Sequence, residues 1–246
     1  TDPHEYQPLP QDIVAATRAD VLFWNGLDME TGDGWFRGLV EVAGKSFEGD
    51  QVIEMAAGVE PLYLTDGAET EVNPHAFLSP RAGIIYTENA LEGLQAADPA
   101  NADVYAANAA AYIAELETWD ASYADGLGSI PEEARILVTS ERAFQYLAAD
   151  YGITEGYLWE IDTDEQGTPQ QIASLITFVR ETQPAGLLVE TNVDARPMET
   201  VSRETGVPIV GEIYSDELGP EGSPGETYVS YLEYNLQMLL KAMTPN

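Results

Sequence analysis

The chain has 246 residues, with 43 Asp and Glu against 10 Lys and Arg, so its formal net charge at pH 7 is −33. Its hydrophobic share of 44% is that of a folded protein, and the apolar residues form blocks such as 21–24 and 186–189, which can build a core. A negative field of this size repels phosphates and anionic lipid headgroups, so nucleic acid and a bare membrane surface are poor candidates for partners.

The acidic residues are spread along the chain, and its only lysines are Lys45 and Lys241. At about 1 M ionic strength the Debye length is roughly 3 Å, so repulsion between surface carboxylates would be screened. We therefore expect a halophilic protein whose fold loosens in dilute buffer. The chain has no cysteine, which excludes disulfides, thiolate metal sites and thiol nucleophiles.

Residues 1–97 alternate short apolar runs with helix patterns, which is typical of a parallel α/β unit. Strands are predicted at 21–24 and 61–64, and helices at 11–18 and 36–45.

One long helix is predicted next. Asp98 and Pro99 supply an N-cap and a first-turn proline, the Ala-rich stretch 101–124 continues the helix, and Gly126 and Gly128 end it.

After Pro131 the alternation of strands and helices resumes. The sequence thus predicts an α/β fold of two Rossmann-like lobes, residues 1–97 and 129–246, joined by a connecting helix at 98–128 that resists large hinge motion. The elements predicted in the second lobe are strands at 136–138, 156–159, 186–189 and 208–213, and helices at 142–151, 169–182, 197–205 and 227–243.

The two histidines of the chain lie in nearly the same local sequence, Asp2-Pro3-His4-Glu5-Tyr6 and Asn73-Pro74-His75-Ala76-Phe77. In each, a turn-forming Asx-Pro pair presents an imidazole, with an aromatic residue two positions later. Because neutral imidazole is the commonest ligand of transition metals, the pair indicates a metal site. The alternative is two unrelated surface histidines.

Position in the fold helps to select the carboxylates, since ligands of parallel α/β sheets bind beyond the carboxyl ends of strands. Glu160, Glu190 and Asp216 each follow a predicted strand. Ser140-Glu141 also lies between a strand and a helix, but it lacks the Gly-x-Ser-x-Gly pattern of a nucleophile elbow, and no further histidine is available as a base.

These residues resemble the metal-specific solute-binding proteins that deliver Mn(II), Zn(II) or Fe(II) to ABC importers, most closely the manganese branch. The resemblance follows the chain in order. It is carried by the two histidine motifs, 98–112, Leu158-Trp159-Glu160-Ile161, Gly167-Thr168-Pro169, 190–202, Gly206-Val207-Pro208-Ile209 and Tyr214-Ser215-Asp216.

The resemblance implies that His4, His75, Glu160 and Asp216 bind the ion between the lobes. Zinc-specific members usually have a histidine at the third position, where this chain would have Glu160, and the segment Thr65–Val72 contains acids instead of the histidine-rich loop of zinc importers. Two carboxylates suit Mn(II), which is therefore the favoured ion, with Zn(II) or Fe(II) as alternatives. The Irving–Williams order nevertheless predicts tighter binding of Zn(II) in vitro.

Two departures from the family pattern affect the site. Asn73 stands where the family often has Asp. The family also has a strand and a helix before its first ligand motif, which here opens the chain. We therefore expect the first lobe to lack them, and His4, on a free end, to be the ligand most prone to be misplaced or disordered.

The resemblance implies an extracellular, monomeric binding component without enzymatic activity, which passes its ion to a membrane permease. Its membrane anchor would belong to an N-terminal segment absent from this sequence. A metalloenzyme using the same ligands and an adhesion or interaction module are the alternatives. Glu190 and Arg196 could orient a ligating carboxylate or form a structural salt bridge.

Overall fold

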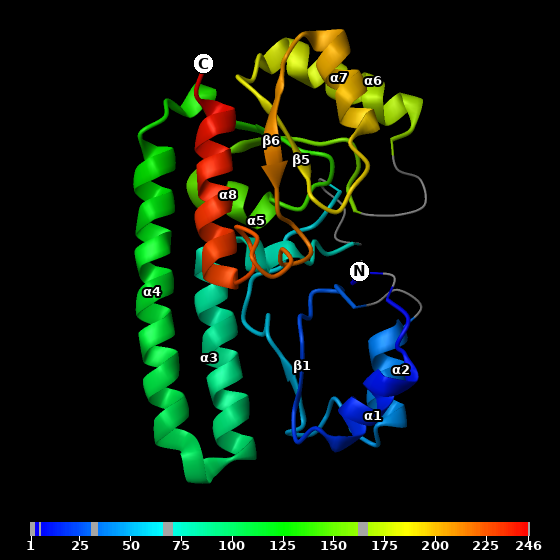
Figure 1. Ribbon diagram of the computed structural model, residues 1–246, viewed down its shortest axis with the longest axis vertical. Coiled ribbons are helices and arrows are strands. Elements are labelled where there is room, and N and C mark those ends of the chain that lie inside the picture. Colours follow the sequence, from blue (N-terminus) through cyan, green and yellow to red (C-terminus); the bar gives the residue numbers. More distant parts are fainter. Residues whose placement is uncertain (1–2, 5, 31–33, 66–70, 162–166, 246) are drawn as a thin grey trace.

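The computed structural model describes residues 3–4, 6–30, 34–65, 71–161 and 167–245 (Figure 1). Asp2 and Glu5 of the first histidine motif lie outside the described residues, as does most of the acidic segment Thr65–Val72.

Residues up to 54 form a small parallel sheet and two helices, at the lower right of Figure 1. Strand β1 (Leu22–Trp24) pairs with β2 (Val52–Glu54). The prediction of a strand at 61–64 was wrong, because this stretch forms only an isolated antiparallel bridge between Tyr63 and Val72. The helices here are α1 (Pro10–Arg18) and α2 (Trp35–Val42).

Two long antiparallel helices, α3 (Pro80–Ala97) and α4 (Ala102–Gly128), lie side by side along the molecule (Figure 1). Sequence analysis did not predict α3, although Ser79 caps it by accepting a hydrogen bond from the Arg81 backbone. The connecting helix was predicted from residue 98, but a short 3-10 helix, η3 (Pro99–Asn101), precedes α4.

Alternate residues of the C-terminal strands face two different cores. Ile136 and Val138 pack with α6 and α7, whereas Leu137 between them packs with α4, α5 and α8. Strands β3 and β5 lie beside each other, and each also has a parallel partner. The elements of this half are η4 (Glu132–Ala134), β3 (Ile136–Val138), α5 (Gln145–Tyr151), β4 (Thr154–Gly156), α6 (Pro169–Thr182), β5 (Leu187–Glu190), α7 (Arg196–Thr205), β6 (Ile209–Ile213) and α8 (Tyr228–Met243).

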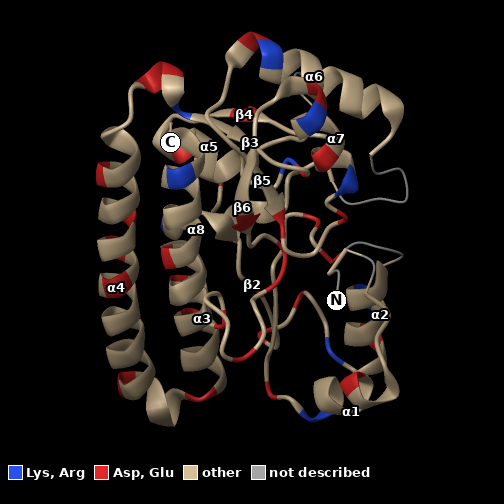
Figure 2. Cartoon of the chain, turned by 45° about the horizontal axis from the view of Figure 1, so that its top comes forward, with Lys and Arg blue, Asp and Glu red and all other residues tan. Residues whose placement is uncertain are grey.

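The predicted fold class, two α/β lobes joined by a long helix, is confirmed, while the domain limits at 97 and 129 stay predictions. Within the described part of the chain, no helix is long and apolar enough to cross a membrane. Acidic residues are scattered over both halves of the molecule, with few basic residues among them (Figure 2).

Candidate metal centre

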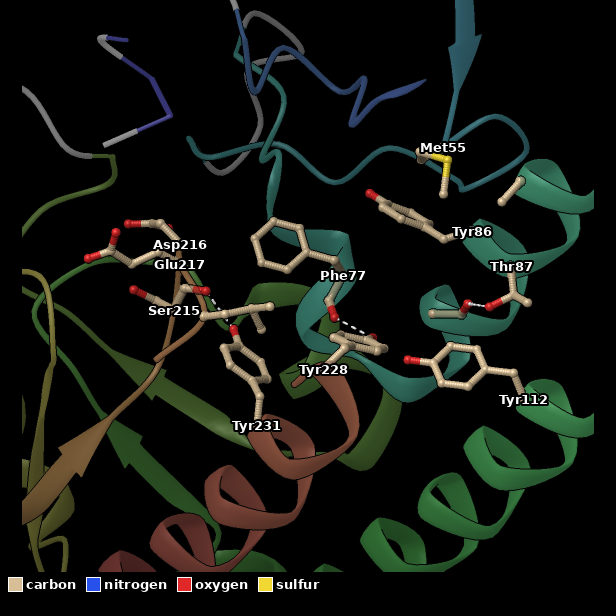
Figure 3. Close-up of a pocket in the computed structure, with 13 residues that line it drawn as sticks. Met55, Phe77, Tyr86, Thr87, Tyr112, Ser215, Asp216, Glu217, Tyr228 and Tyr231 are labelled. Carbon is tan, nitrogen blue, oxygen red and sulfur yellow. Dashed lines mark hydrogen bonds between the residues drawn. The ribbon is translucent and has the colours of Figure 1, made fainter. Parts of the chain in front are cut away.

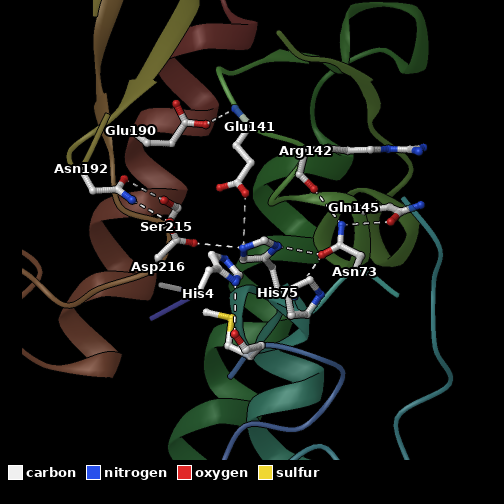
Figure 4. Close-up of polar contacts among 12 residues, drawn as sticks. His4, Asn73, His75, Glu141, Arg142, Gln145, Glu190, Asn192, Ser215 and Asp216 are labelled. Atoms are coloured by element: carbon white, nitrogen blue, oxygen red, sulfur yellow. Dashed lines mark hydrogen bonds and ion pairs between the residues drawn. The ribbon is translucent and has the colours of Figure 1, made fainter. Parts of the chain in front are cut away.

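His75 begins the short 3-10 helix η2 (His75–Leu78), and its side chain is completely buried. Its Nδ1 lies 2.8 Å from Oδ1 of Asn73. The Asn73 amide is oriented by its other contacts, because its Nδ2 donates to the Arg142 carbonyl at 2.7 Å and to Gln145 Oε1 at 3.0 Å. Nδ1 of His75 therefore carries a proton, and Nε2 is left to face the carboxylates on the other side of the ring (Figure 4).

His4 lies against His75, with ring centroids 5.4 Å apart and the rings edge to face. The His4 side chain is buried, and its Nδ1 is 3.2 Å from the Met29 carbonyl oxygen. The indole of Trp35 donates to the Pro3 carbonyl at 3.1 Å, which fixes the adjoining backbone. The structure therefore places His4 beside His75 and does not show it misplaced.

Glu141 is the carboxylate that joins both imidazoles. One ligand atom from each of His4, His75 and Glu141 can be chosen so that all three lie within 4.8 Å of one another. All three residues are buried, and Glu141 Oε1 is 3.9 Å from His75 Nε2. Glu141 follows β3, so it occupies the strand-end position that ligands of parallel sheets favour.

Glu160, which the resemblance implied as the third ligand, lies elsewhere. The backbone of Trp159 forms a parallel bridge with Glu141, and the Trp159 side chain is buried in the core. The next side chain, that of Glu160, is partly exposed, and it accepts a hydrogen bond of 3.4 Å from the Thr65 hydroxyl. The geometry thus brings Glu141, in place of Glu160, to the histidines.

Asp216 follows β6 and completes the group, with Oδ1 3.0 Å from His75 Nε2. Burial alone would raise the pKa of the Asp216 carboxyl, but its hydrogen bond to His75 and the charges of His75 and His4 lower this pKa below its usual value. Asn192 adds a hydrogen bond of 2.6 Å to Oδ2. The ionised carboxylate is therefore favoured at this position.

Glu190, at the end of β5, supports the neighbouring loop. Its carboxylate accepts hydrogen bonds from the backbone amides of Ser140, at 3.0 Å, and Glu141, at 2.8 Å (Figure 4). Burial raises the pKa of Glu190 to about 7 against the opposing effect of these bonds. Arg196, by contrast, is exposed and pairs with Asp194, so it does not orient a ligating carboxylate.

An apolar cavity of about 450 Å³ adjoins the acidic side of the site. It lies between α3, α4, α8 and the segment 215–218, and its walls include Phe77, Tyr86, Tyr228 and Tyr231 (Figure 3). Tyr228 and Tyr231 donate their hydroxyl hydrogens to backbone carbonyls, so mainly their rings face the cavity.

Two imidazoles and two carboxylates converge from four separate segments of the chain, three of which were predicted to contribute. The charges of Glu141 and Asp216 would balance a divalent cation, and the nitrogen and oxygen donors suit a first-row transition metal. Sequence analysis missed Glu141 although the strand-end rule applies to it, because that rule was used only for the three acids after other strands.

The family model described as "Zinc-uptake complex component A periplasmic" matches residues 1–242, so the chain belongs to this family. It is 41% identical over 244 residues to the iron ABC transporter substrate-binding lipoprotein MtsA of Streptococcus pyogenes serotype M1, covering 98% of this chain and 78% of that protein. The manganese ABC transporter substrate-binding lipoprotein PsaA of Streptococcus anginosus is 40% identical over 245 residues, covering 99% and 79%.

A solved structure of a Mn-bound periplasmic metal binding protein from Candidatus Liberibacter asiaticus has the same fold. It superposes with a TM-score of 0.88 at 27% sequence identity, covering 99% of this chain and 88% of that one.

Proposed function

We propose that this chain is the substrate-binding component of a metal ABC importer, which captures a divalent ion outside the cell and delivers it to a membrane permease. The family match and the two lipoprotein relatives support this function. The observation that carries it is the buried group of two histidines and two carboxylates between the halves of the chain. Because the ion is cargo, we propose that the protein has no catalytic turnover. We also propose that it acts as a monomer.

In this proposal His4, His75, Glu141 and Asp216 are the ligands, and Glu141 replaces Glu160 in the set that the sequence suggested. His75 would bind through Nε2, because Nδ1 is bonded to Asn73. His4 would likewise use Nε2, since its Nδ1 contacts a backbone carbonyl.

Mn(II) is the proposed physiological ion. The donors include two carboxylates, which suit this larger and harder ion, and one relative is named a manganese transporter protein. Another relative is named for iron, so Fe(II) and Zn(II) belong in every titration. The names of both relatives as lipoproteins support an extracellular, membrane-attached location.

The test compares two glutamates that are close in sequence and different in position. Metal-free protein is titrated with Mn(II), Zn(II) and anaerobic Fe(II) by calorimetry, using the unchanged chain, His75→Ala, Glu141→Gln and Glu160→Gln. We expect His75→Ala to abolish most binding and Glu141→Gln to weaken it by at least about tenfold. Glu160→Gln should bind as the unchanged chain does.

Thermal unfolding gives an independent measurement. An ion at a thousandfold its Kd stabilises the folded state by about 4 kcal/mol, so metal should raise the melting temperature and a chelator should reverse the rise. A rise that persists in His75→Ala would contradict the proposed site. Loss of binding in Glu160→Gln, with Glu141→Gln unaffected, would restore the ligand set suggested by the sequence.

A further inference from the structure

The two oxygens of the Asp216 carboxylate have different neighbours. Oδ1 lies 3.0 Å from Nε2 of His75 and faces the metal centre. Oδ2 accepts a hydrogen bond of 2.6 Å from Nδ2 of Asn192 (Figure 4). One oxygen thus faces the ion's position, while the other is engaged by the protein.

The orientation of the Asn192 amide follows from its contact with Asp216. An ionised carboxylate can only accept hydrogen bonds, so the NH₂ group must face Asp216, and Oδ1 is left to accept a hydrogen bond of 3.1 Å from the Ser215 hydroxyl. Ser215 and the Asp216 side chain are both almost completely buried. This short network therefore forms in a site of low dielectric constant, where its hydrogen bonds are strong.

Hydrogen bonds matter here because close packing is incomplete. Ser215, Asp216, Glu217 and Leu218 line the apolar cavity, so on that side the segment does not pack closely against other protein atoms (Figure 3). The orientation of the Asp216 carboxylate therefore depends on its polar contacts, with His75 at Oδ1 and with Asn192 at Oδ2.

We propose that Asn192 is a specificity-determining residue, which restricts Asp216 to one metal-binding oxygen and so limits the coordination number of the captured ion. This inference rests on the proposed metal-capture function. Four-coordinate sites suit Zn(II), whereas Mn(II) is best satisfied by more oxygen donors. Within a donor set whose two carboxylates suit Mn(II), Asn192 therefore favours a smaller coordination number and lowers the preference for Mn(II) over Zn(II). Releasing Oδ2 should increase that preference.

The experiment measures the ratio of the Kd for Mn(II) to the Kd for Zn(II) in the full chain and in Asn192→Ala. We expect this ratio to fall by about tenfold in the variant, because Oδ2 becomes available to Mn(II). X-ray absorption at the Mn edge should then count more oxygen ligands than in the unchanged chain. An unchanged ratio, or equal losses of both affinities, would overturn the proposal.

Asn101→Ala is the matched control. Asn101 also donates from Nδ2 to Oδ2 of an aspartate, Asp98, at 2.7 Å, but it does so at the exposed start of α4. This variant should leave the ratio of the two Kd values unchanged.

A second variant covers the case in which Asn192→Ala does not fold, which melting without metal would reveal. Ser215→Ala removes the hydrogen bond that holds Oδ1 of Asn192 and should lower the ratio in the same direction. An unchanged ratio in this variant would then count against the proposal. If the unchanged chain binds neither ion, the proposed function itself fails, which is a distinguishable result.

Discussion

Each histidine of the candidate metal centre has one ring nitrogen in contact with an orienting oxygen, and in our proposal the other nitrogen binds the ion. Nδ1 of His4 contacts the Met29 carbonyl oxygen, and Nδ1 of His75 contacts Oδ1 of Asn73. Oxygen partners of this kind hold the ring in place and increase its basicity. Asn73 does this as a neutral amide, so it adds no negative charge where the family often has Asp.

Glu190 acts on the site without pointing at the ion. In Glu190→Ala the amides of Ser140 and Glu141 lose their buried acceptor, and each such loss costs about 1–3 kcal/mol. We expect lower stability in urea unfolding and metal affinity weakened by about tenfold, because the Glu141 loop is released.

The control for this prediction is Glu212→Ala, which removes an exposed glutamate from the neighbouring strand β6. It should change neither quantity measurably. Equal effects of the two substitutions would show that the buried carboxylate does not support the loop.

The sequence could single out His4 and His75 by their shared motif, whereas Asp216 was one of three strand-end acids and was selected through the family resemblance. Glu141 has no such pattern, and in a chain with 43 acids its role depends on which side chain of the loop after β3 turns inward. That direction is fixed by Glu190, 49 residues away, and by the bridge between Glu141 and Trp159. Contacts between distant segments of this kind leave no local signal.

At the scale of elements, α3 lies between η2, which carries His75, and β2. Its glycines allow neighbouring elements to approach the helix closely. A Cβ at Gly93 would lie 2.7 Å from Cγ1 of Ile53 in β2, and a Cβ at Gly83 would lie 2.5 Å from the Tyr228 hydroxyl oxygen. Both glycines face neighbouring elements, so the absence of a side chain allows those elements to pack closely against α3.

Gly93→Ala therefore tests how α3 packs on β2. Alanine favours a helix over glycine by up to about 1 kcal/mol, but here overlap with Ile53 should outweigh this gain and destabilise the fold by about 1–3 kcal/mol. In Gly126→Ala of α4 the nearest atom would be Leu240 Cδ1, at 3.4 Å, so this control should be neutral or stabilising. Thermal unfolding of both variants measures whether the two changes in stability have opposite signs. Stabilisation by Gly93→Ala would contradict the close packing of α3 on β2.

Helix caps, glycines and tertiary contacts explain which elements could be predicted from the sequence. Helices α6 and α8 begin with capping boxes, at Thr168 and Thr227, and both were predicted to within a residue or so of their observed limits. Helix α3 was missed because it contains two glycines and buries parts of several faces, which obscures a helical pattern. The run 61–64 is apolar like a strand, but its position beside α5 is decided by tertiary contacts such as the bond from the Leu62 amide to the Tyr146 hydroxyl.

At the scale of the whole molecule, we expect the net charge of −33 to have a large effect on stability. Unscreened repulsion between carboxylates opposes the compact state, and about 1 M salt reduces its range to roughly 3 Å. We expect the melting temperature of the metal-free protein to rise steadily from dilute buffer to molar KCl, with no comparable rise in a neutral osmolyte. Equal stability at both salt concentrations would contradict the halophilic interpretation.

The most direct test of the central claim is anomalous scattering from crystals of the full chain prepared with Mn(II), with data collected on both sides of the Mn absorption edge. Our account predicts one strong peak between the two halves, within bonding distance of His4 Nε2, His75 Nε2, Glu141 and Asp216. A peak that lies beside Glu160 instead of Glu141, or away from both histidines, would contradict it.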